Sequence, residues 1–354
     1  MDPRERFLRA CRRQPVDRPP VWFMRQAGRY MPEYRRVREG CSLLDLCHRP
    51  ELAAEVTITA AERLGVDAAI IFADLLLPAE PLGFAVQFAA GEGPVITPAL
   101  GREADPAAAI AALPEPAPEA LGYVAETVRL TRAHFGGRLA VIGFAGAPFT
   151  LASYLIEGGA SRTFLATKRL LWTQPAAWDR LMDKLCAMLI PFLSQQVAAG
   201  ADAVQLFDSW AGTLAEADYR RYVLPYNQRI VGALEALGTP VIYFSTGTAG
   251  YLEALAETGA SVFSVDWRVD LAAAWRRLGP GAAVQGNLDP AALLAPRAEL
   301  RAAVRRVLAA AAGRAGHIFN LGHGVFPETP VSNVRAVVEM VQAEAPAASR
   351  EIGQ

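Results

Sequence analysis

The chain has 354 residues, of which 52% are hydrophobic, with 35 basic residues against 36 acidic ones. This composition supports one large domain or two ordinary ones, and the near-neutral balance argues against a protein built mainly to bind nucleic acid. The longest uncharged run, 139–156, contains Gly143, Gly146 and Pro148, so it predicts a strand and a turn rather than a membrane span. The first residues lack the apolar core of a signal peptide, and we expect a cytoplasmic protein without membrane contact.

Short apolar runs alternate with longer amphipathic ones along the chain, after a first segment that predicts a helix at about 3–13. The short runs are predicted to be strands at 21–24, 68–72, 140–143, 203–207, 241–244, 262–265, 283–285 and 317–320. The longer runs are predicted to be helices, for example at 52–64, 176–199, 215–237, 249–258, 297–312 and 331–342.

Several predicted helices are followed by a glycine and then a strand, as at Gly65, Gly200, Gly238 and Gly259, which is typical of a parallel sheet. Eight such units predict an α/β fold with a single (β/α)8 TIM-type barrel over residues 1–354. A doubly wound sheet is the weaker alternative, because no Gly-x-Gly-x-x-Gly follows the first strand. The proline- and glycine-rich stretch 78–119 predicts an insertion between strands two and three, with a small hairpin around 84–88 and then a helix to about 134.

Arginine is concentrated near the N-terminus, where residues 1–40 hold eleven arginines against five acidic residues. Arg25 and Arg29 flank a short segment with Ala27 and Gly28 directly after the first predicted strand. Because the guanidinium group binds carboxylate or phosphate through two parallel hydrogen bonds, these two arginines predict an anion site. The arginines of the first predicted helix are interpreted as a solvated basic face with surface ion pairs: Arg4, Arg6, Arg9, Arg12 and Arg13.

A (β/α)8 barrel carries its functional site at the C-terminal ends of its strands. Polar residues that follow the predicted strands are Arg25, Gln26, Arg29, Asp74, Tyr154, Asp208, Ser209, Ser245, Thr246, Asp266, Asn287, Asp289 and His323.

Some of these polar residues have a structural explanation. Asp266 and Asp289 precede helices and are interpreted as caps or supporting partners, and Asp74 could also cap a helix or pair with an arginine. Tyr154 could be a packed core residue, whereas His323 stands between two glycines and is interpreted as functional. The four histidines and four cysteines show no zinc-ligand spacing, so we expect no metal site and buried free thiols. What remains is a pocket with arginines at its mouth, one carboxylate and neutral donors, which suits a large polyanion with a cationic or NH-rich centre.

Four ordered segments of the sequence resemble the uroporphyrinogen decarboxylase family of haem biosynthesis. They are FMRQAGRYMPEYR at 23–35, GFAGAPFT at 143–150, QLFDSWAG at 205–212 and FNLGHG at 319–324. The resemblance therefore extends over essentially the whole chain, and the first segment is long and highly specific.

The resemblance implies a (β/α)8 barrel, a homodimer, no metal and no organic cofactor. It implies removal of carboxyl groups from the four acetate side chains of uroporphyrinogen III, which gives coproporphyrinogen III and four CO2. It also implies that Asp74 faces the pyrrole NH groups, that Tyr154 and Ser209 contact the substrate, and that His323 closes the site. The implied carboxylate-binding segment is Arg25, Gln26, Ala27, Gly28 and Arg29, with Arg38 as a further ligand.

The implied chemistry needs no bound electron sink, because a pyrrole protonated on a ring carbon can itself accept electrons from the departing carboxylate. The Asp74 carboxylate is then expected to be ionised in the complex and to stabilise that cation. The general acid stays open among Arg25, Tyr154, His323, a water molecule and a substrate carboxyl group.

Three other functions were compared with this one. Methyltransferases of the same superfamily carry a zinc-binding His-x-Cys segment after strand five, whereas here Tyr243 to Gly247 contains no thiol. Nucleic-acid binding would use aromatic residues that interleave with the N-terminal arginines, such as Trp22 and Tyr30, but the near-neutral chain disfavours it. A catalytically inactive scaffold is disfavoured by the complete set of candidate site residues.

Overall fold

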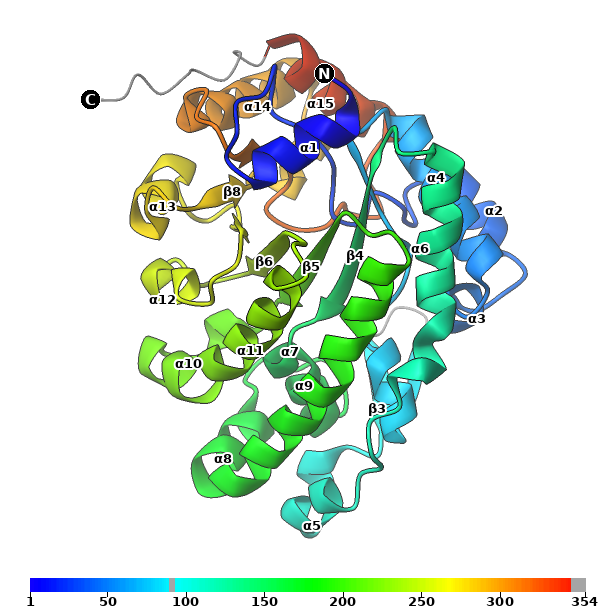
Figure 1. Cartoon of the computed structure of the whole chain (residues 1–354), viewed down its shortest axis with the longest axis vertical. Helices are drawn as coiled ribbons and strands as arrows, with labels where there is room; N and C mark the ends of the chain where they lie inside the picture. Colours follow the sequence, from blue (N-terminus) through cyan, green and yellow to red (C-terminus); the bar gives the residue numbers. More distant parts are fainter. Residues whose placement is uncertain (89–92, 345–354) are drawn as a thin grey trace.

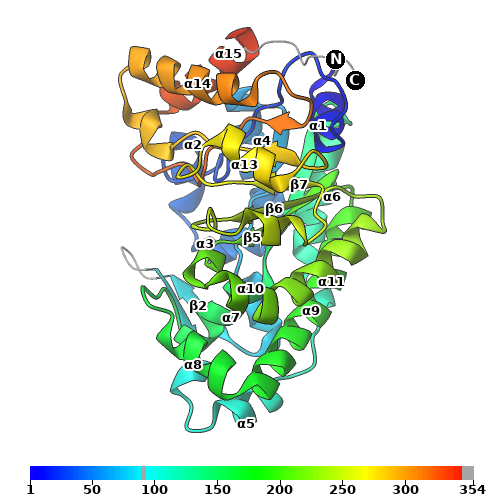
Figure 2. The same cartoon turned by 90° about the vertical axis from the view of Figure 1, so that its left-hand side faces the viewer.

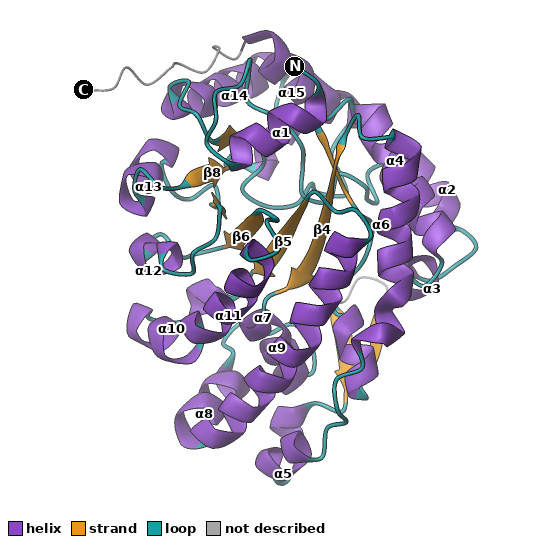
Figure 3. Cartoon of the chain, in the orientation of Figure 1, coloured by secondary structure: helices purple, strands orange, loops and turns teal. Residues whose placement is uncertain are grey.

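The computed structural model describes residues 1–88 and 93–344 (Figure 1). Its centre is a curled parallel sheet of seven strands surrounded by helices (Figure 3), which confirms the predicted α/β fold. The strands follow one another in chain order around the sheet: β1 (Ala68–Ile70), β4 (Ala140–Gly146), β5 (Ala203–Asp208), β6 (Val241–Ser245), β7 (Val262–Ser264), β8 (Ala283–Gln285) and β9 (His317–Ile318).

The predicted first strand, 21–24, is wrong as a strand and is reduced to one isolated bridge between Val21 and Phe319. On one side, the Trp22 N–H donates to the Phe319 carbonyl at 3.3 Å. On the other side, the Val21 N–H donates to Oδ2 of Asp67 at 2.9 Å, while its carbonyl accepts from the Asp67 N–H at 2.8 Å. A side chain thus takes the place of a backbone partner, and the segment closes the gap between β9 and β1 without forming a regular ladder.

Most of the predicted helices are confirmed, and their ends follow proline and glycine. Pro50 and Pro175 begin two of them, and Gly65 ends one in the left-handed region at φ 72°, as expected for a residue without a side chain. The confirmed helices are α1 (Pro3–Cys11), α4 (Pro50–Leu64), α9 (Pro175–Ala198), α14 (Arg297–Ala311) and α15 (Val331–Glu344).

Two of the helix predictions were too long. The predicted helix 215–237 is divided into α10 (Glu216–Tyr222) and α11 (Leu224–Glu235), because Val223 leaves the helical region and Pro225, in the first turn of α11, has no N–H to continue the bonds of α10. The predicted helix 249–258 shortens to α12 (Leu252–Ala256). Further helices are α2 (Pro32–Arg38), α3 (Leu43–Cys47), α7 (Pro148–Glu157), α8 (Leu165–Thr173) and α13 (Leu271–Leu278).

The predicted insertion forms an extension at the end of the molecule away from α1, beside α8 (Figures 1 and 2). Its hairpin is confirmed as the antiparallel pair β2 (Ala85–Phe88) and β3 (Pro94–Thr97), and residues 89–92 between them lie outside the described residues. The Ile96 N–H donates to the Gly158 carbonyl at 3.0 Å, so the hairpin is attached to the end of α7. The other elements are η1 (Leu77–Leu82), η2 (Leu100–Arg102), α5 (Pro106–Ala111), η3 (Pro118–Leu121) and α6 (Gly122–Phe135).

The interpretation of the first helix as a solvated basic face is wrong for two of its arginines, Arg6 and Arg4, which pair with buried carboxylates. Arg6 is only 5% exposed and forms an ion pair with the buried Asp67 at 2.8 Å. Arg4 pairs with Asp202 at 2.7 Å. Both carboxylates stand directly before a strand, so α1 lies across the N-terminal end of the barrel.

The remaining arginines of the predicted first helix, Arg9, Arg12 and Arg13, have different surroundings. The Arg13 guanidinium donates to the carbonyl of Gly281, just before β8. Arg9 pairs with Glu5 at 2.6 Å on the exposed side, and Arg12 is exposed. The solvated interpretation therefore holds for Arg9, Arg12 and Arg13, the last of which is exposed although it donates to one backbone carbonyl.

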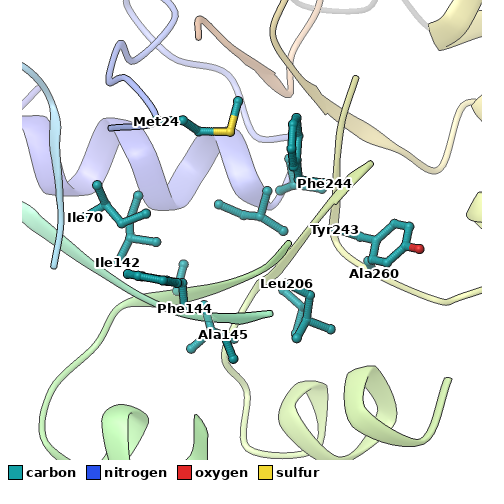
Figure 4. Packing of buried hydrophobic residues seen from close by; sticks show 14 of the residues in the cluster. Met24, Ile70, Ile142, Phe144, Ala145, Leu206, Tyr243, Phe244 and Ala260 are labelled. Carbon is teal, nitrogen blue, oxygen red and sulfur yellow. The ribbon is translucent and has the colours of Figure 1, made fainter. Parts of the chain in front are cut away.

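The core fills the inside of the sheet and the space between the sheet and the helices. In Figure 4, Ile142 and Phe144 of β4 lie on one face of the sheet, whereas Leu206 of β5, which is in register with Ala145, lies on the other face. Deeper in the barrel, Gln285 donates to Oε1 of Gln205 at 3.1 Å, so the interior contains a polar layer as well as an apolar one.

Two further predictions concern the thiols and the membrane. The buried free thiols are confirmed for Cys11, Cys47 and Cys186, whereas Cys41 is partly exposed. Among residues 1–88 and 93–344, no helix is long and apolar enough to cross a membrane.

Candidate active site

A cavity of about 860 Å³ opens at the C-terminal ends of the strands, the place predicted for the site. Its wall includes residues that directly follow β1 and β5, together with residues 323–325 from the loop after β9. The structure brings every predicted site residue to this cavity: Arg25, Gln26, Ala27, Gly28, Arg29, Arg38, Asp74, Tyr154, Ser209 and His323.

Arg25 and Arg29 lie on a tight loop between the Val21 bridge and α2. Within this loop the Tyr30 hydroxyl donates to the Gln26 carbonyl at 2.6 Å, and the Met31 N–H donates to the Gly28 carbonyl at 2.9 Å. Both arginines are exposed and line the cavity, and neither forms an ion pair with a described residue. Two guanidinium groups therefore face the cavity with their hydrogen-bonding capacity available to an anion.

The side chain of Gln26 stabilises the arginine loop and does not offer hydrogen bonds to the cavity. It is fully buried, its Nε2 donates to the Ala68 carbonyl at 3.2 Å, and its Oε1 accepts from the Phe23 N–H at 3.3 Å. The side chain thus anchors the arginine loop to β1, because its amide is occupied on both sides by backbone groups.

Arg38, at the end of α2, adds a third cation to the wall. It is partly exposed, donates to the Cys41 carbonyl, and has no ion-pair partner in the described part of the chain. Three arginines thus line one cavity without a carboxylate partner among the described residues, and the positive charge that they share is not neutralised by them. The cavity is therefore electrostatically prepared for a ligand with several negative charges.

Asp74 is the carboxylate of the site, and its exposed part faces the cavity. Its Oδ1 accepts from the Leu76 N–H at 2.9 Å, so one carboxylate oxygen has the capping function suggested for this residue. The other oxygen has no hydrogen bond with a described residue. Burial raises the pKa of Asp74, while the Leu76 N–H and the nearby Arg25 act in the opposite direction.

Tyr154 and Ser209 supply neutral polar groups from two neighbouring elements. Tyr154 lies on α7, and its ring meets that of Trp210 edge-on at 5.8 Å. Burial and the nearby Asp74 raise the pKa of Tyr154, so its hydroxyl keeps its proton. Ser209 follows β5, where its carbonyl accepts from the Thr246 hydroxyl at 2.8 Å.

His323 lies on the loop after β9. Its Nδ1 accepts from the N–H of Gly324 at 2.8 Å, which places the proton of the neutral ring on Nε2. Burial lowers the pKa of His323 to about 4, and Arg25 and Arg268 lower it further than Asp266 raises it. At neutral pH this side chain is therefore an uncharged hydrogen-bond donor.

An aromatic wall that the sequence reasoning did not identify separates the barrel core from the cavity. Phe144, Phe207 and Phe244 line the cavity, with ring centroids 5.4 Å apart for the first pair and 5.6 Å for the second. The ring of His323 continues this row at 6.0 Å from Phe244. The available signal was an aromatic residue near the C-terminal end of three successive predicted strands. Such a wall gives a large planar or cyclic ligand an apolar surface.

The other polar residues that follow the predicted strands lie outside the cavity wall. Asp266 accepts from the Gly247 N–H at 2.6 Å, and Asp289 caps a short helix by accepting from the Ala291 N–H at 2.9 Å. Both therefore have the supporting functions predicted for them. Within the described ranges, no three His, Cys, Asp or Glu side chains gather as a metal-binding group.

The fold is also found in a solved methyltransferase from Methanosarcina mazei. That structure superposes with a TM-score of 0.81 and covers 97% of this chain and 98% of its own, at 20% sequence identity. At this identity, the likeness concerns the fold alone.

The sequence comparisons are more specific. The family described as "Uroporphyrinogen decarboxylase (URO-D)" matches residues 2–344. Proteins named uroporphyrinogen decarboxylase from Koribacter versatilis and Sorangium cellulosum are each 55% identical to this chain, over 96% of it and 96% of their own length. A protein of the same name from Chloroflexus aggregans is 53% identical over the same shares. The chain therefore belongs to the uroporphyrinogen decarboxylase family.

Proposed function

We propose that this protein converts uroporphyrinogen III to coproporphyrinogen III by removing the carboxyl groups of its four acetate side chains. Each step breaks one carbon–carbon bond, releases CO2 and places a proton on the carbon that becomes a methyl group. The family assignment over residues 2–344 supports this reaction. The observation that carries it in the structure is one cavity wall that combines an aromatic surface, the carboxylate of Asp74 and three arginines that form no ion pair with a described residue.

The arginines bind the substrate by charge. Uroporphyrinogen carries eight carboxylates, and Arg25, Arg29 and Arg38 offer planar donor groups from one side of the cavity. The same charges attract the polyanion from solution and fix its orientation. Gly28 and Ala27 keep this segment of the wall free of large side chains.

Asp74 stabilises the reacting ring. One of its carboxylate oxygens is held by Leu76, and the other accepts hydrogen bonds from pyrrole NH groups. When a ring carbon is protonated, the ring becomes cationic and accepts the electron pair left by the departing CO2. A fixed carboxylate beside this cation contributes about 3–4 kcal/mol, the scale of one preorganised electrostatic contact.

Tyr154, Ser209 and His323 complete the substrate contacts. Tyr154 and His323 are uncharged at neutral pH, since burial raises the pKa of one and lowers that of the other. We propose that they act as hydrogen-bond donors to substrate carboxylates. Arg25, Tyr154, His323, a bound water molecule and a substrate carboxyl group are the candidates for the proton donor.

We propose in addition a single domain over residues 1–354, a cytoplasmic homodimer, and catalysis without metal or organic cofactor. The last proposal rests on chemistry, because the pyrrole ring of the substrate serves as the electron sink. Light scattering of the purified protein tests the dimer, and activity after dialysis against a chelator tests the cofactor proposal. A monomer, or activity that returns only with added metal, would contradict these two proposals respectively.

The reaction itself is tested by anaerobic incubation of the purified protein with uroporphyrinogen III, followed by oxidation and chromatography of the porphyrins. The expected result is stepwise loss of carboxyl groups that ends at the four-carboxyl product. No conversion by folded protein would show that this chain acts on another substrate.

A further inference from the structure

Arg25 is the most constrained residue of the arginine loop. Its backbone lies in the left-handed region, at φ +59°, a conformation that non-glycine residues adopt infrequently and at some energetic expense. The side chain nevertheless has no ion pair with a described residue that could fix its direction. Its position in the cavity must therefore be set by packing and by the backbone on either side.

The residue before Arg25 is held by the loop that follows β9. The Met24 N–H donates to Oδ1 of Asn320 at 3.2 Å, and the Met24 carbonyl accepts from the Val325 N–H at 3.1 Å. Asn320 is fully buried, and the same Oδ1 accepts from the N–H of Leu321 at 2.8 Å. The loop 320–325 thus binds both the N–H and the carbonyl of Met24, the residue before Arg25.

Gly324 of the same loop supports the side chain of Arg25. A Cβ atom added to Gly324 would lie 2.5 Å from Cδ and 2.7 Å from Cγ of Arg25. The aliphatic part of Arg25 therefore rests directly on the Cα of this glycine. The backbone of Gly324 is outside the positive-φ region, so the glycine is required by this contact and not by its own conformation.

We propose that Gly324 is a positioning residue that sets the place of the Arg25 guanidinium in the cavity, with Asn320 and Val325 fixing the backbone before it. The inference deepens the proposed function, since it rests on Arg25 as a ligand of substrate carboxylate. It links the two loops that carry Arg25 and His323 into one unit, because Gly324 also holds Nδ1 of His323 through its N–H.

The test is a double-mutant cycle with Gly324→Ala, Arg25→Ala and the double variant. An alanine at position 324 displaces the Arg25 side chain, so kcat/KM should fall by at least about tenfold, the effect of losing one charge-assisted hydrogen bond. The split between KM and kcat should match that of Arg25→Ala. In the double variant, Gly324→Ala should cause little further loss of kcat/KM, because the Arg25 side chain that it would displace is absent.

The matched control is Gly232→Ala on the exposed side of α11, where an added Cβ meets no atom within 4 Å; its kinetics should equal those of the wild type. Thermal unfolding establishes that each variant is folded. If Gly324→Ala alone unfolds, the double variant should fold again, because the clash is with Arg25. A double variant that also fails to fold would overturn the proposal.

Binding of uroporphyrin III, the oxidised form with the same eight carboxylates, gives a readout independent of turnover through quenching of tryptophan fluorescence. Wild-type protein that binds this probe with the same non-additive pattern, yet does not convert uroporphyrinogen III, would retain the positioning proposal and refute the proposed function. Wild-type kinetics and binding in folded Gly324→Ala, or effects of the two substitutions that multiply, would refute the positioning proposal.

Discussion

The hydroxyl of Tyr243 donates a 2.6 Å hydrogen bond to Oδ2 of Asp208, and both side chains are buried behind the cavity wall. Their neighbours Phe207, Ser209 and Phe244 line the cavity, because successive side chains of a strand point to opposite faces. Asp208 also accepts from Thr150 and Asn227. This carboxylate therefore connects β5, β6 and the helices behind them, and it supports the wall although it does not itself line the cavity.

Replacing Tyr243 with Phe should destabilise the protein by about 1.5–3 kcal/mol, the range for a lost hydrogen bond to a charged group. Urea unfolding measures this difference, and kcat and KM of the folded variant should stay close to those of the wild type. The control is Tyr226→Phe. The Tyr226 hydroxyl bonds to the exposed Asp179, so its removal should lower the free energy of unfolding by less. Full stability together with lost activity would place Asp208 in the catalytic machinery instead.

Asp74→Asn should fold normally and lose at least about 100-fold in kcat/KM, because the neutral amide does not stabilise the cationic ring. Steady-state kinetics with uroporphyrinogen III measure the loss. The control is Asp289→Asn, which keeps a good helix cap and lies outside the cavity, so its kinetics should be unchanged. Near-normal turnover by folded Asp74→Asn would remove Asp74 from its central role.

Arg29→Ala should raise KM by about tenfold or more, since it removes a charge-assisted contact to a substrate carboxylate. The rise should shrink at high ionic strength, where the attraction of the wild-type site is itself screened. Arg36→Ala provides the control, because Arg36 is exposed on the neighbouring α2 and does not line the cavity. Equal kinetic effects of the two substitutions would mean that only the general basic field matters.

The buried His317 should make the protein less stable in mild acid. Burial lowers its pKa to about 4, whereas an unfolded histidine titrates at about 6.5. Between these values the unfolded chain binds more protons, so stability falls as the pH drops through 6.5 towards 4. The contribution of His317 at pH 5 is a loss of about 2 kcal/mol relative to pH 8.

His317→Gln removes this titration, and unfolding free energies measured at pH 8 and pH 5 should differ less in the variant than in the wild type. The comparison at pH 8, where the histidine is neutral in both states, isolates the loss of its hydrogen bond to the Gly286 carbonyl. His323, whose pKa is also lowered to about 4, keeps its share of the pH dependence. An unchanged pH dependence in His317→Gln would contradict the assignment.

Patterns that repeat along the chain were sufficient to predict seven strands of the sheet, their parallel order and the end of the sheet at which the cavity opens. Where the pattern failed, a side chain or a proline decided the structure. The carboxylate of Asp67 takes the N–H of Val21 in place of a backbone partner, and Pro225 lies in the first turn of a new helix after Val223. Periodicity contains no information on such contacts between distant residues.

All residues predicted for the candidate site line the cavity, because ordered motifs carried them, but the aromatic wall and the contacts of each side chain were not predicted. Gln26 stands within the arginine segment, yet its amide is bonded to the backbone of Phe23 and Ala68. Arg6 was interpreted as solvated and is instead buried against Asp67. The sequence shows which side chains are present. The direction in which each side chain points depends on the backbone geometry of the folded chain.

The contacts of α1 have a consequence for the order of folding. Arg6 and Arg4 of this helix bind Asp67 and Asp202, and Arg13, just after the helix, binds the carbonyl of Gly281. These partners lie 61, 198 and 268 positions further along the chain. The helix therefore cannot complete its contacts until the chain segments before β1, β5 and β8 have been brought together, so it docks late in folding.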